Sequence, residues 1–546
     1  MGNRITQRNI LPSAIRRKHG VIQEKEFAAI VAPSGGIGDF QDIQSAIDFV
    51  NKIGGGTVFV KAGIYSLISS LELFSNISLI GEDRDTVILD LGSNNIQVKA
   101  VGDTFEYRTG TITISNGSST ITGSGTSWLA NVTTSDRILL DGVLYDVGSI
   151  NSDTSITLDT TYQGASFSSV SYVAASFLSN ISISQLTIRN AINTDSTTKG
   201  LVQFDYVENS SIDNVKTENH QSTSGAVNGI FLKRCATTSV KNCEVKRNGS
   251  SGINLDSGQG CTIENCFSHD NATRGVLINA SLGLGTKNIV KNNTICQNLT
   301  IGITSISGKT VITGNMIYRN NTDGIEILWQ EHLVTGNLIE QNGGDGIELG
   351  GTASDFNTIV GNYISFNGGQ SIKISDTGAT RNVIASNNLR QDDNTTVPIS
   401  YAGTINHFES NLTTDLINER KFVVALNNSG GNLVTGDIVI LDSATVGSSR
   451  ITTTTTGGSN KVFGMVAGNI TSAEIGFVQV GGYTTSLKVD GTTDIAVGDF
   501  ISTFTTAKIG KKAVAGDTAI AIAYEAYATD DSSGVIDALI ISPRLI

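Results

Sequence analysis

Gly324-Ile-Glu-Ile327 and Gly346-Ile-Glu-Leu349 are two copies of a short phrase that recurs along the middle of the chain. Each copy alternates apolar and polar residues, which indicates a short strand with one buried face. In steps of 23, 23, 27, 22, 22 and 25 residues, the phrase begins at Gly229, Gly252, Gly275, Gly302, Gly324, Gly346 and Ser371. A repeat of this length cannot bury its apolar side chains alone, so neighbouring repeats are expected to stack and share one core.

An asparagine stands four residues before each phrase from the second copy onward. These residues are Asn248, Asn271, Asn298, Asn320, Asn342 and Asn367. Asparagine tolerates the left-handed backbone of tight corners, and its side chain can hydrogen-bond to the equivalent residue of the next repeat. Short strands and regular corners together predict the stacked coils of a parallel β-helix.

The overall composition agrees with many short strands joined by turns, because 546 residues include 60 Gly and only 4 Pro. The formal net charge of −13 argues against a nucleic-acid groove and is compatible with neutral or sugar-like partners. No run of 18 apolar residues occurs, so we expect no membrane insertion.

All five cysteines lie between Cys235 and Cys296, and two of them, Cys243 and Cys266, each follow an asparagine. Their spacing matches no zinc template, and an odd number argues against a disulfide framework. We therefore expect buried free thiols stacked inside adjacent coils. The sequence implies no metal site and no cofactor.

The region before the repeats contains a segment with helical spacing, residues 42–51, whose apolar side chains Ile43, Ala46, Ile47 and Val50 share one face. Glycines and a strand at 57–60 follow it, as expected for a cap over the open end of a solenoid. The cap and the Asn/Gly coils together resemble the pectin-lyase-like right-handed parallel β-helix superfamily, in the version used by bacteriophage tailspikes and related surface depolymerases. The resemblance implies the fold more than the chemistry, because this fold carries lyases, hydrolases and binding proteins.

The sequence divides into five predicted parts, with an all-β fold throughout. They are an N-terminal attachment segment (1–30), a cap with the first coils (31–104), an inserted small β-barrel-like module (105–175), the main β-helix (176–412) and a C-terminal β domain (413–546). The inserted module resembles insertions of phage tail proteins, and the last part resembles domains that close phage fibres and often hold three chains together. The resemblance implies a homotrimer, and the alternative is a β-sandwich on a monomer.

The first 30 residues carry Arg4, Arg8, Arg16, Arg17 and Lys18 before any acidic residue. They are either a disordered tail or a peptide that becomes ordered when it docks on a virion or particle protein. This N-terminus lacks the apolar core of a secretion signal. We therefore expect a surface appendage of a virion, made in the host cytoplasm without a signal peptide.

The outward residue of the recurring phrase is a glutamate in two successive copies, Glu326 and Glu348. On neighbouring coils the two side chains would stack about 4.8 Å apart. Carboxylates this close repel each other, so one can hold a proton and act as an acid while the other is ionised. A separation of about 5 Å is also typical of retaining glycosidases.

Two aspartates, Asp323 and Asp345, precede the same two phrases. The stretch 321–324 resembles the first catalytic motif of polygalacturonases, which share this fold. Their second motif is a pair of adjacent aspartates, of which only Asp345 is present here, and their Gly-His-Gly and Arg-x-Lys motifs are missing. The resemblance therefore makes these two coils a candidate site, but it does not imply polygalacturonase activity.

Aromatic and basic residues are expected around these four carboxylates. Trp329, Tyr318 and Tyr363 provide faces on which sugar rings can stack. Arg274 and Lys373 flank the site and could bind acidic sugars. The alternative is that the carboxylates are solvated and balance the charge of a neighbouring lysine.

These observations predict a tailspike or fibre protein that recognises a cell-surface polysaccharide. Hydrolysis of that polysaccharide by Glu326, Glu348, Asp323 and Asp345 is a further possibility, and lyase chemistry is not excluded. The competing prediction is a non-catalytic fibre or capsid-decorating protein whose β-helix is a rigid spacer.

Overall fold

The computed structural model describes residues 27–102, 106–140, 143–280, 286–391, 399–401, 406–409, 412–415, 420–442, 450–473, 475–528 and 531–546. It consists of two compact units, the first ending at His332 and the second beginning at Leu333. This division lies within the predicted β-helix, and the predicted domain limits stay predictions. The expected attachment peptide falls largely on residues 1–26, which lie outside the described residues.

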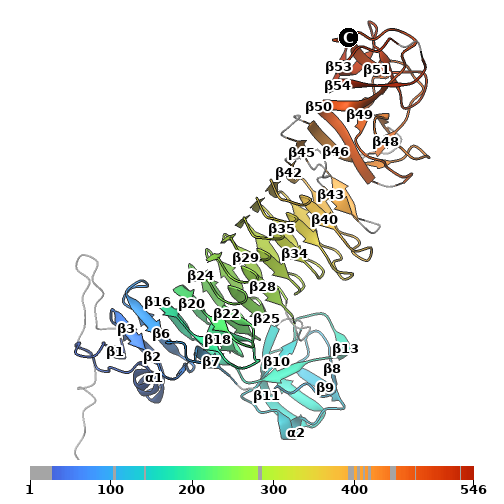
Figure 1. The fold of residues 1–546 in the computed structure, drawn as a ribbon. Helices are drawn as coiled ribbons and strands as arrows, with labels where there is room; N and C mark the ends of the chain where they lie inside the picture. The colour runs from blue at the N-terminus through green and yellow to red at the C-terminus, as the bar shows by residue number, and fades with distance from the viewer. Residues whose placement is uncertain are drawn as a thin grey trace, which may run out of the picture. The chain divides into compact units, whose positions relative to one another are not determined.

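The first unit is built around stacked coils that form two parallel sheets (Figure 1). Sheet 2 receives one strand from each coil, the recurring phrase of the sequence. In the main repeats its strands are β18 (Lys199–Asp205), β22 (Val227–Lys233), β25 (Ile253–Asp256), β28 (Val276–Asn279), β31 (Ile303–Ser305) and β34 (Ile325–Ile327). Each strand pairs in parallel with the next one, so that equivalent positions of successive phrases lie opposite each other.

Sheet 1 receives two strands from most coils of the same unit. They are β16 (Ser182–Arg189), β20 (Ser211–Glu218), β23 (Ser239–Lys241), β24 (Glu244–Lys246), β26 (Thr262–Glu264), β27 (Phe267–His269), β29 (Ile289–Lys291), β30 (Thr294–Cys296), β32 (Val311–Thr313) and β33 (Met316–Tyr318). The middle side chain of these short strands points inward and is buried, as at Val240, Ile263 and Ile312. The structure therefore confirms the predicted all-β fold with a right-handed parallel β-helix.

Several of the glycines that open the phrases lie where the coil turns tightly against its neighbour, as at Gly252. A Cβ atom on Gly252 would lie 2.2 Å from Ser268 Oγ and 2.7 Å from Asn271 Nδ2. Such contacts are too short for any side chain, so only glycine allows the corner and the strand to pack this closely.

The asparagines before the phrases form an internal ladder. Asn248 Nδ2 donates to Asn271 Oδ1 at 2.9 Å, and Asn271 Nδ2 donates to Asn298 Oδ1 at 3.0 Å. The left-handed backbone expected of these asparagines belongs instead to the residue before each of them, as at Asp270 (φ 54°) before Asn271. The asparagine side chain must point inward to reach the next coil, and the preceding residue makes the turn.

All five cysteines are buried and free, as predicted. Cys243 and Cys266 lie inside adjacent coils, where each sulfur donates to a carbonyl of its own coil at 3.2 and 3.3 Å. Burial is the largest of the causes that raise the pKa of the Cys266 thiol well above its usual value, so this thiol stays protonated at neutral pH.

The predicted cap helix is α1 (Ile43–Lys52), which begins after Asp42. The Asp42 carboxylate accepts a hydrogen bond from the Ser45 backbone N–H at 2.7 Å, which satisfies one free donor of the first turn. The expected apolar face, Ile43, Ala46, Ile47 and Val50, is buried. The helix packs on the first parallel strands, β1 (Ala29–Val31), β2 (Gly56–Val60) and β5 (Ile77–Gly81).

The inserted module is antiparallel and has a core of its own. Its elements are β8 (Thr111–Ile114), β9 (Thr120–Ser124), α2 (Trp128–Asn131), β10 (Arg137–Leu140), β11 (Val143–Ser152), β12 (Ser155–Leu158), β13 (Phe167–Val170) and β14 (Val173–Ala175). Trp128 lies at the centre of that core and donates from Nε1 to the Tyr172 hydroxyl at 2.8 Å.

The second unit begins with further coils of the same kind. Its recurring phrases form β37 (Ile347–Leu349), β40 (Ile372–Ile374) and β43 (Ile399–Tyr401), which pair in parallel with one another and are the sheet 2 strands of this unit. The sheet 1 strands of this unit are β35 (Leu333–Thr335), β36 (Leu338–Glu340), β38 (Thr358–Val360), β39 (Tyr363–Ser365), β41 (Val383–Ala385), β42 (Asn388–Gln391), β44 (His407–Glu409) and β45 (Leu412–Asp415).

The second unit ends in an antiparallel β domain with two apolar clusters. Its strands are β46 (Arg420–Asn427), β47 (Ile438–Leu441), β48 (Arg450–Thr452), β49 (Val462–Val466), β50 (Ile475–Val489), β51 (Phe500–Thr503), β52 (Gly510–Lys512), β53 (Thr518–Ala523) and β54 (Gly534–Leu545). No helix among the described residues has the length and apolar character needed to cross a membrane.

Candidate functional site

In the first unit, Glu326 is the outward residue of β34 and lies opposite Thr304 of β31. Arg274, at the corner before β28, donates from Nε to Thr304 Oγ1 at 2.8 Å. The same hydroxyl donates to Glu326 Oε2 at 3.1 Å. Arg274 and Glu326 are thereby joined through one hydroxyl, and Thr304 is fully buried between them although it points away from the core.

In the second unit, Glu348 is the outward residue of β37 and lies opposite Lys373 of β40. Lys373 Nζ lies 3.0 Å from Glu348 Oε1 and 3.0 Å from Asp345 Oδ2. The buried Asp345 also accepts a hydrogen bond from the Gln370 backbone N–H at 2.7 Å. Lys373 therefore forms ion pairs with two carboxylates.

The environment of Lys373 shifts its pKa above the ordinary value. Burial alone would lower the pKa, but the hydrogen bonds and charges of Asp345 and Glu348 together outweigh it. Lys373 is therefore charged at neutral pH. This arrangement matches the alternative in which a lysine balances the charge of a glutamate, and it makes Asp345 a positioning group for Lys373.

Two other predicted residues flank Glu326 in the first unit. Asp323 lies at the corner before β34, where its carbonyl oxygen accepts a hydrogen bond from the Gly302 N–H at 3.0 Å. Trp329 follows β34 and is 42% exposed, which is unusual for an indole. Its ring passes close to Gly308, where a Cβ atom would lie 3.0 Å from Trp329 Cδ1.

The two tyrosines lie on sheet 1 and not on the sheet that carries the glutamates. Tyr318 ends β33, opposite Cys296 of the preceding coil. Tyr363 begins β39, and its hydroxyl accepts a hydrogen bond from Arg390 Nη1 at 2.7 Å. Sequence proximity suggested that both would surround the glutamates, but a corner separates the two sheets within each coil.

The nine predicted residues divide between the two units. Glu326, Asp323, Tyr318, Trp329 and Arg274 belong to the first, and Asp345, Glu348, Tyr363 and Lys373 to the second. The predicted stacking of Glu326 on Glu348, and of Asp323 on Asp345, crosses this division and stays a prediction.

Two contributors to these networks were missed from the sequence. Thr304 occupies the outward position of its phrase one coil before Glu326, so the repeat could have predicted that the two side chains lie next to each other. Gln370 contributes only its backbone N–H, for which no side-chain pattern gives a signal.

A family model described as "Periplasmic copper-binding protein (NosD)" matches residues 152–382. No curated protein sequence matches the chain. Histidine, cysteine and methionine are the side chains that bind copper most readily. Among the described residues, no three potential ligands that include a histidine or cysteine lie close enough to share an ion. The described residues therefore hold no site of three or more histidine, cysteine or carboxylate ligands in which a histidine or cysteine takes part.

Three solved structures to which this chain is similar have low sequence identity and TM-scores below 0.5. The A-module of the Azotobacter vinelandii mannuronan C-5 epimerase AlgE6 is 16% identical, with a TM-score of 0.45, over 68% of this chain and 90% of that one. The Gp54 tailspike of Acinetobacter baumannii bacteriophage AP22 is 11% identical, with a TM-score of 0.39, over 92% of each chain. The periplasmic alginate epimerase AlgG is 12% identical, with a TM-score of 0.36, over 65% of this chain and 76% of that one.

The expected location on a virion is wrong. The matching family model is described as a periplasmic protein and not as a component of a virion. The expectation came from resemblance to tailspikes, but stacked coils are a scaffold that proteins of several locations use.

Proposed function

We propose that this chain binds an extended polysaccharide outside the bacterial cytoplasm, through the outward side chains of sheet 2 and the residues that flank it. The observation that carries the proposal is Trp329, which is 42% exposed and follows Glu326 by three residues, just beyond the end of β34. An exposed indole offers a flat face to a sugar ring, and an adjacent carboxylate accepts hydrogen bonds from sugar hydroxyls.

The hydrogen bond from Thr304 orients Glu326 without neutralising it. The carboxylate retains acceptor positions beyond the one that Thr304 uses. Arg274, held by the same hydroxyl, adds a positive charge near this carboxylate and suits a polysaccharide with acidic groups. In the second unit, Lys373 provides the corresponding positive charge, with Glu348 and Asp345 as its partners.

Cleavage of the bound polysaccharide is a second proposal, which rests on the same residues. Glu326 would be the acid or base, and Asp323, Asp345 and Glu348 are the other candidate groups. Of these, Asp345 is the least accessible, because it is buried and engaged by Lys373 and Gln370. We therefore assign it to positioning rather than to contact with a reacting bond.

The test uses a panel of acidic and neutral bacterial exopolysaccharides. Retention of the wild-type protein in affinity gels measures binding, and release of reducing ends measures hydrolysis, with absorbance at about 235 nm monitored for the unsaturated product of a lyase. We expect retention by at least one polysaccharide, weakened by Trp329→Ala. The exposed Leu299→Ala is a control because that side chain lies outside the candidate site and is also exposed.

Retention with no products would support binding without cleavage. Products formed by the wild type and lost in Glu326→Gln would support cleavage as well. No retention by any polysaccharide of the panel would contradict the proposal and favour the rigid spacer.

We also propose that the chain forms a homotrimer through the outward face of sheet 1. In the first unit this face exposes apolar side chains, with Phe267 39% and Met316 44% exposed. Burying such side chains against a second copy would be favourable. Light scattering after size-exclusion chromatography should give three times the chain mass of 57.4 kDa, and a monomer mass would contradict this proposal.

A further inference from the structure

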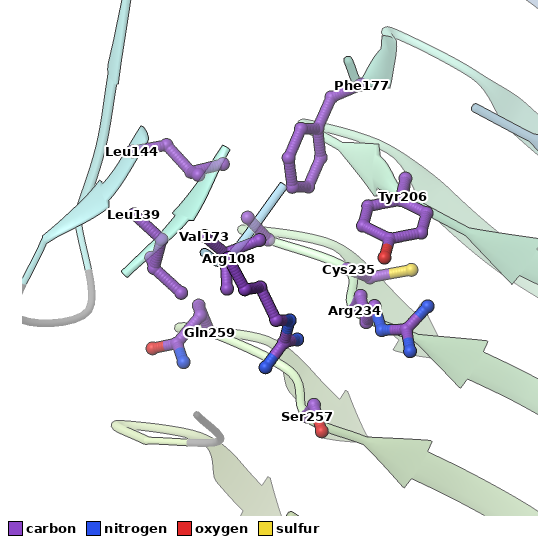
Figure 2. A pocket seen from close by; sticks show the side chains of 11 residues that line it. Arg108, Leu139, Leu144, Val173, Phe177, Tyr206, Arg234, Cys235, Ser257 and Gln259 are labelled. Atoms are coloured by element: carbon purple, nitrogen blue, oxygen red, sulfur yellow. The ribbon is translucent and has the colours of Figure 1, made fainter. Parts of the chain in front are cut away.

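A pocket lies between the inserted module and the coils of the first unit (Figure 2). It is an open depression: its empty space of about 370 Å³ includes the solvent of its mouth, and the space that the centre of a water molecule can occupy within it is about 20 Å³. The module contributes Leu139 of β10, Leu144 of β11 and Val173 of β14, and Arg108 precedes β8. The coils contribute Tyr206, Arg234, Ser257 and Gln259.

One side of the pocket is apolar. Figure 2 shows Leu139, Leu144 and Phe177 around its upper part, with Val173 behind Arg108. Phe177 packs edge-on against Tyr206, with ring centroids 5.6 Å apart. These side chains form a wall that favours a ligand with an apolar portion.

The other side carries two guanidinium groups and one carboxylate behind them. Arg108 Nη2 donates to Glu106 Oε2 at 2.8 Å, and Arg234 Nε lies 3.3 Å from the same oxygen. The Tyr206 hydroxyl also donates to this oxygen. The nearby Asp205 is paired with Lys233 at 3.2 Å. Glu106 therefore pairs with both guanidinium groups, and Asp205 lies close enough for its charge to act on Arg234 as well; no carboxylate is among the described residues that line the pocket.

The hydrogen-bonding capacity of the two arginines is not used up within the described part of the chain. There, Nε of Arg108 is buried without a hydrogen-bond acceptor. Nε of Arg234 also lacks an acceptor with hydrogen-bond geometry, although it lies within ion-pair distance of Glu106. A buried donor on a charged group costs free energy when it has no acceptor, so an incoming anion would be stabilised here.

We propose that this pocket binds a small monocarboxylate that carries a short apolar group. The carboxylate lies at Arg108 and Arg234, because a guanidinium binds a carboxylate through two parallel hydrogen bonds. The apolar group lies against Leu139, Leu144 and Phe177. This goes beyond the proposed function, since the ligand is either a free acid or an acidic substituent on a saccharide, and its binding does not depend on sheet 2.

Isothermal titration calorimetry of the full chain tests the proposal with 4-methylpentanoate as the probe. We expect 4-methylpentanamide, which has the same shape without the charge, and inorganic phosphate, which lacks the apolar group, to bind at least tenfold more weakly. Methyl glucuronide represents the saccharide source. Tighter binding of methyl glucuronide supports an acidic saccharide as the natural ligand, and tighter binding of 4-methylpentanoate supports a free acid.

Two variants separate binding from folding. Arg108→Gln removes one guanidinium, and Leu144→Glu places a competing carboxylate in the pocket while leaving both guanidiniums. Each should weaken binding of 4-methylpentanoate at least tenfold. Arg381→Gln is the matched control, because Arg381 is paired with Asp355 at 3.0 Å in the second unit, and it should bind like the wild type.

Three results would overturn the proposal. They are no heat of binding at millimolar 4-methylpentanoate, equal binding of the amide or of phosphate, and unchanged binding in Leu144→Glu. The last result remains decisive if Arg108→Gln disturbs the docking of the module. Because every probe is small, failure here would leave polysaccharide binding by sheet 2 untouched.

Discussion

Glu326 and Glu348 occupy the same position of the same phrase, one in each unit, yet their surroundings differ. Opposite Glu326 stands Thr304, whose hydroxyl donates one hydrogen bond to the carboxylate. Opposite Glu348 stands Lys373, which pairs with this carboxylate and with Asp345. The repeat sets where a side chain lies, and the residue one coil away decides whether a cation pairs with it directly, as Lys373 does, or is linked to it through a hydroxyl, as Arg274 is.

The largest effect on stability is expected from removing the lysine of the second unit. Lys373→Met leaves the buried Asp345 with the Gln370 N–H but without its cation. We expect the free energy of unfolding to fall by about 2 kcal/mol, less than for a fully buried pair because Lys373 is partly exposed. Urea unfolding followed by circular dichroism measures it.

The control for this variant is Lys309→Met, in which an exposed lysine 3.7 Å from Glu331 is lost. It should change the free energy of unfolding by less than about 0.5 kcal/mol. Equal effects of the two substitutions would contradict a special role for Lys373.

The same pair should make stability depend on pH at the alkaline end. The pKa of Lys373 is raised in the folded state, so its contribution is fully present below the unfolded lysine pKa of about 10.4. The contribution is lost as the pH rises through the higher folded pKa. The difference in urea midpoint between wild type and Lys373→Met should therefore be constant from pH 7 to 9 and shrink above about pH 10.4. A difference that grows with pH would contradict this sign.

A smaller effect is expected in the first unit from Thr304→Val. The substitution keeps the shape of the buried side chain but removes the hydroxyl between Arg274 and Glu326. We expect a loss of about 1 kcal/mol in the free energy of unfolding. Ser305→Ala is the control for binding: it removes a buried hydroxyl of the same strand, which lies 2.8 Å from His332 Nε2, so it should also lower stability but should leave polysaccharide binding unchanged. If Thr304→Val binds polysaccharide like the wild type, this hydroxyl does not orient Glu326 for binding.

The smallest effect on stability is expected from Trp329→Ala, because 42% of this residue is exposed to solvent. The free energy of unfolding should change by less than about 0.5 kcal/mol. Affinity for the polysaccharide should fall about tenfold, since one stacked ring is lost. A large loss of stability would instead make Trp329 part of the core packing around Gly308.

The fold was predictable because the same sequence pattern, a strand phrase preceded by an asparagine, recurs in successive coils. Each phrase shows the strand period and each asparagine marks a corner, so the stacked phrase strands and the cap helix followed from local pattern. The position of the left-handed residue did not follow, because asparagine suits both that backbone and an inward ladder. The hydrogen bond from Asn248 to Asn271 shows that the asparagine side chain points inward to the next coil, so the preceding residue adopts the left-handed backbone.

The candidate sites were predictable only where they follow the repeat. Glu326 and Glu348 were found from their shared position, whereas the tyrosines were grouped with them by sequence distance and lie across a corner. No sequence pattern predicted the pocket, because the pocket forms where Arg108 of the inserted module lies near Arg234 of a coil more than a hundred residues later in the chain. Such a contact depends on how the module docks, and no period or motif encodes it.

The most direct test of polysaccharide binding by sheet 2 is the affinity of Glu326→Gln and Glu348→Gln, measured side by side by calorimetry on a polysaccharide that retains the wild type. The account predicts at least tenfold weaker binding for Glu326→Gln, whose carboxylate retains acceptor positions for sugar hydroxyls. It predicts less than threefold weaker binding for Glu348→Gln, whose carboxylate is already paired with Lys373. Equal affinities for both variants and the wild type would contradict it.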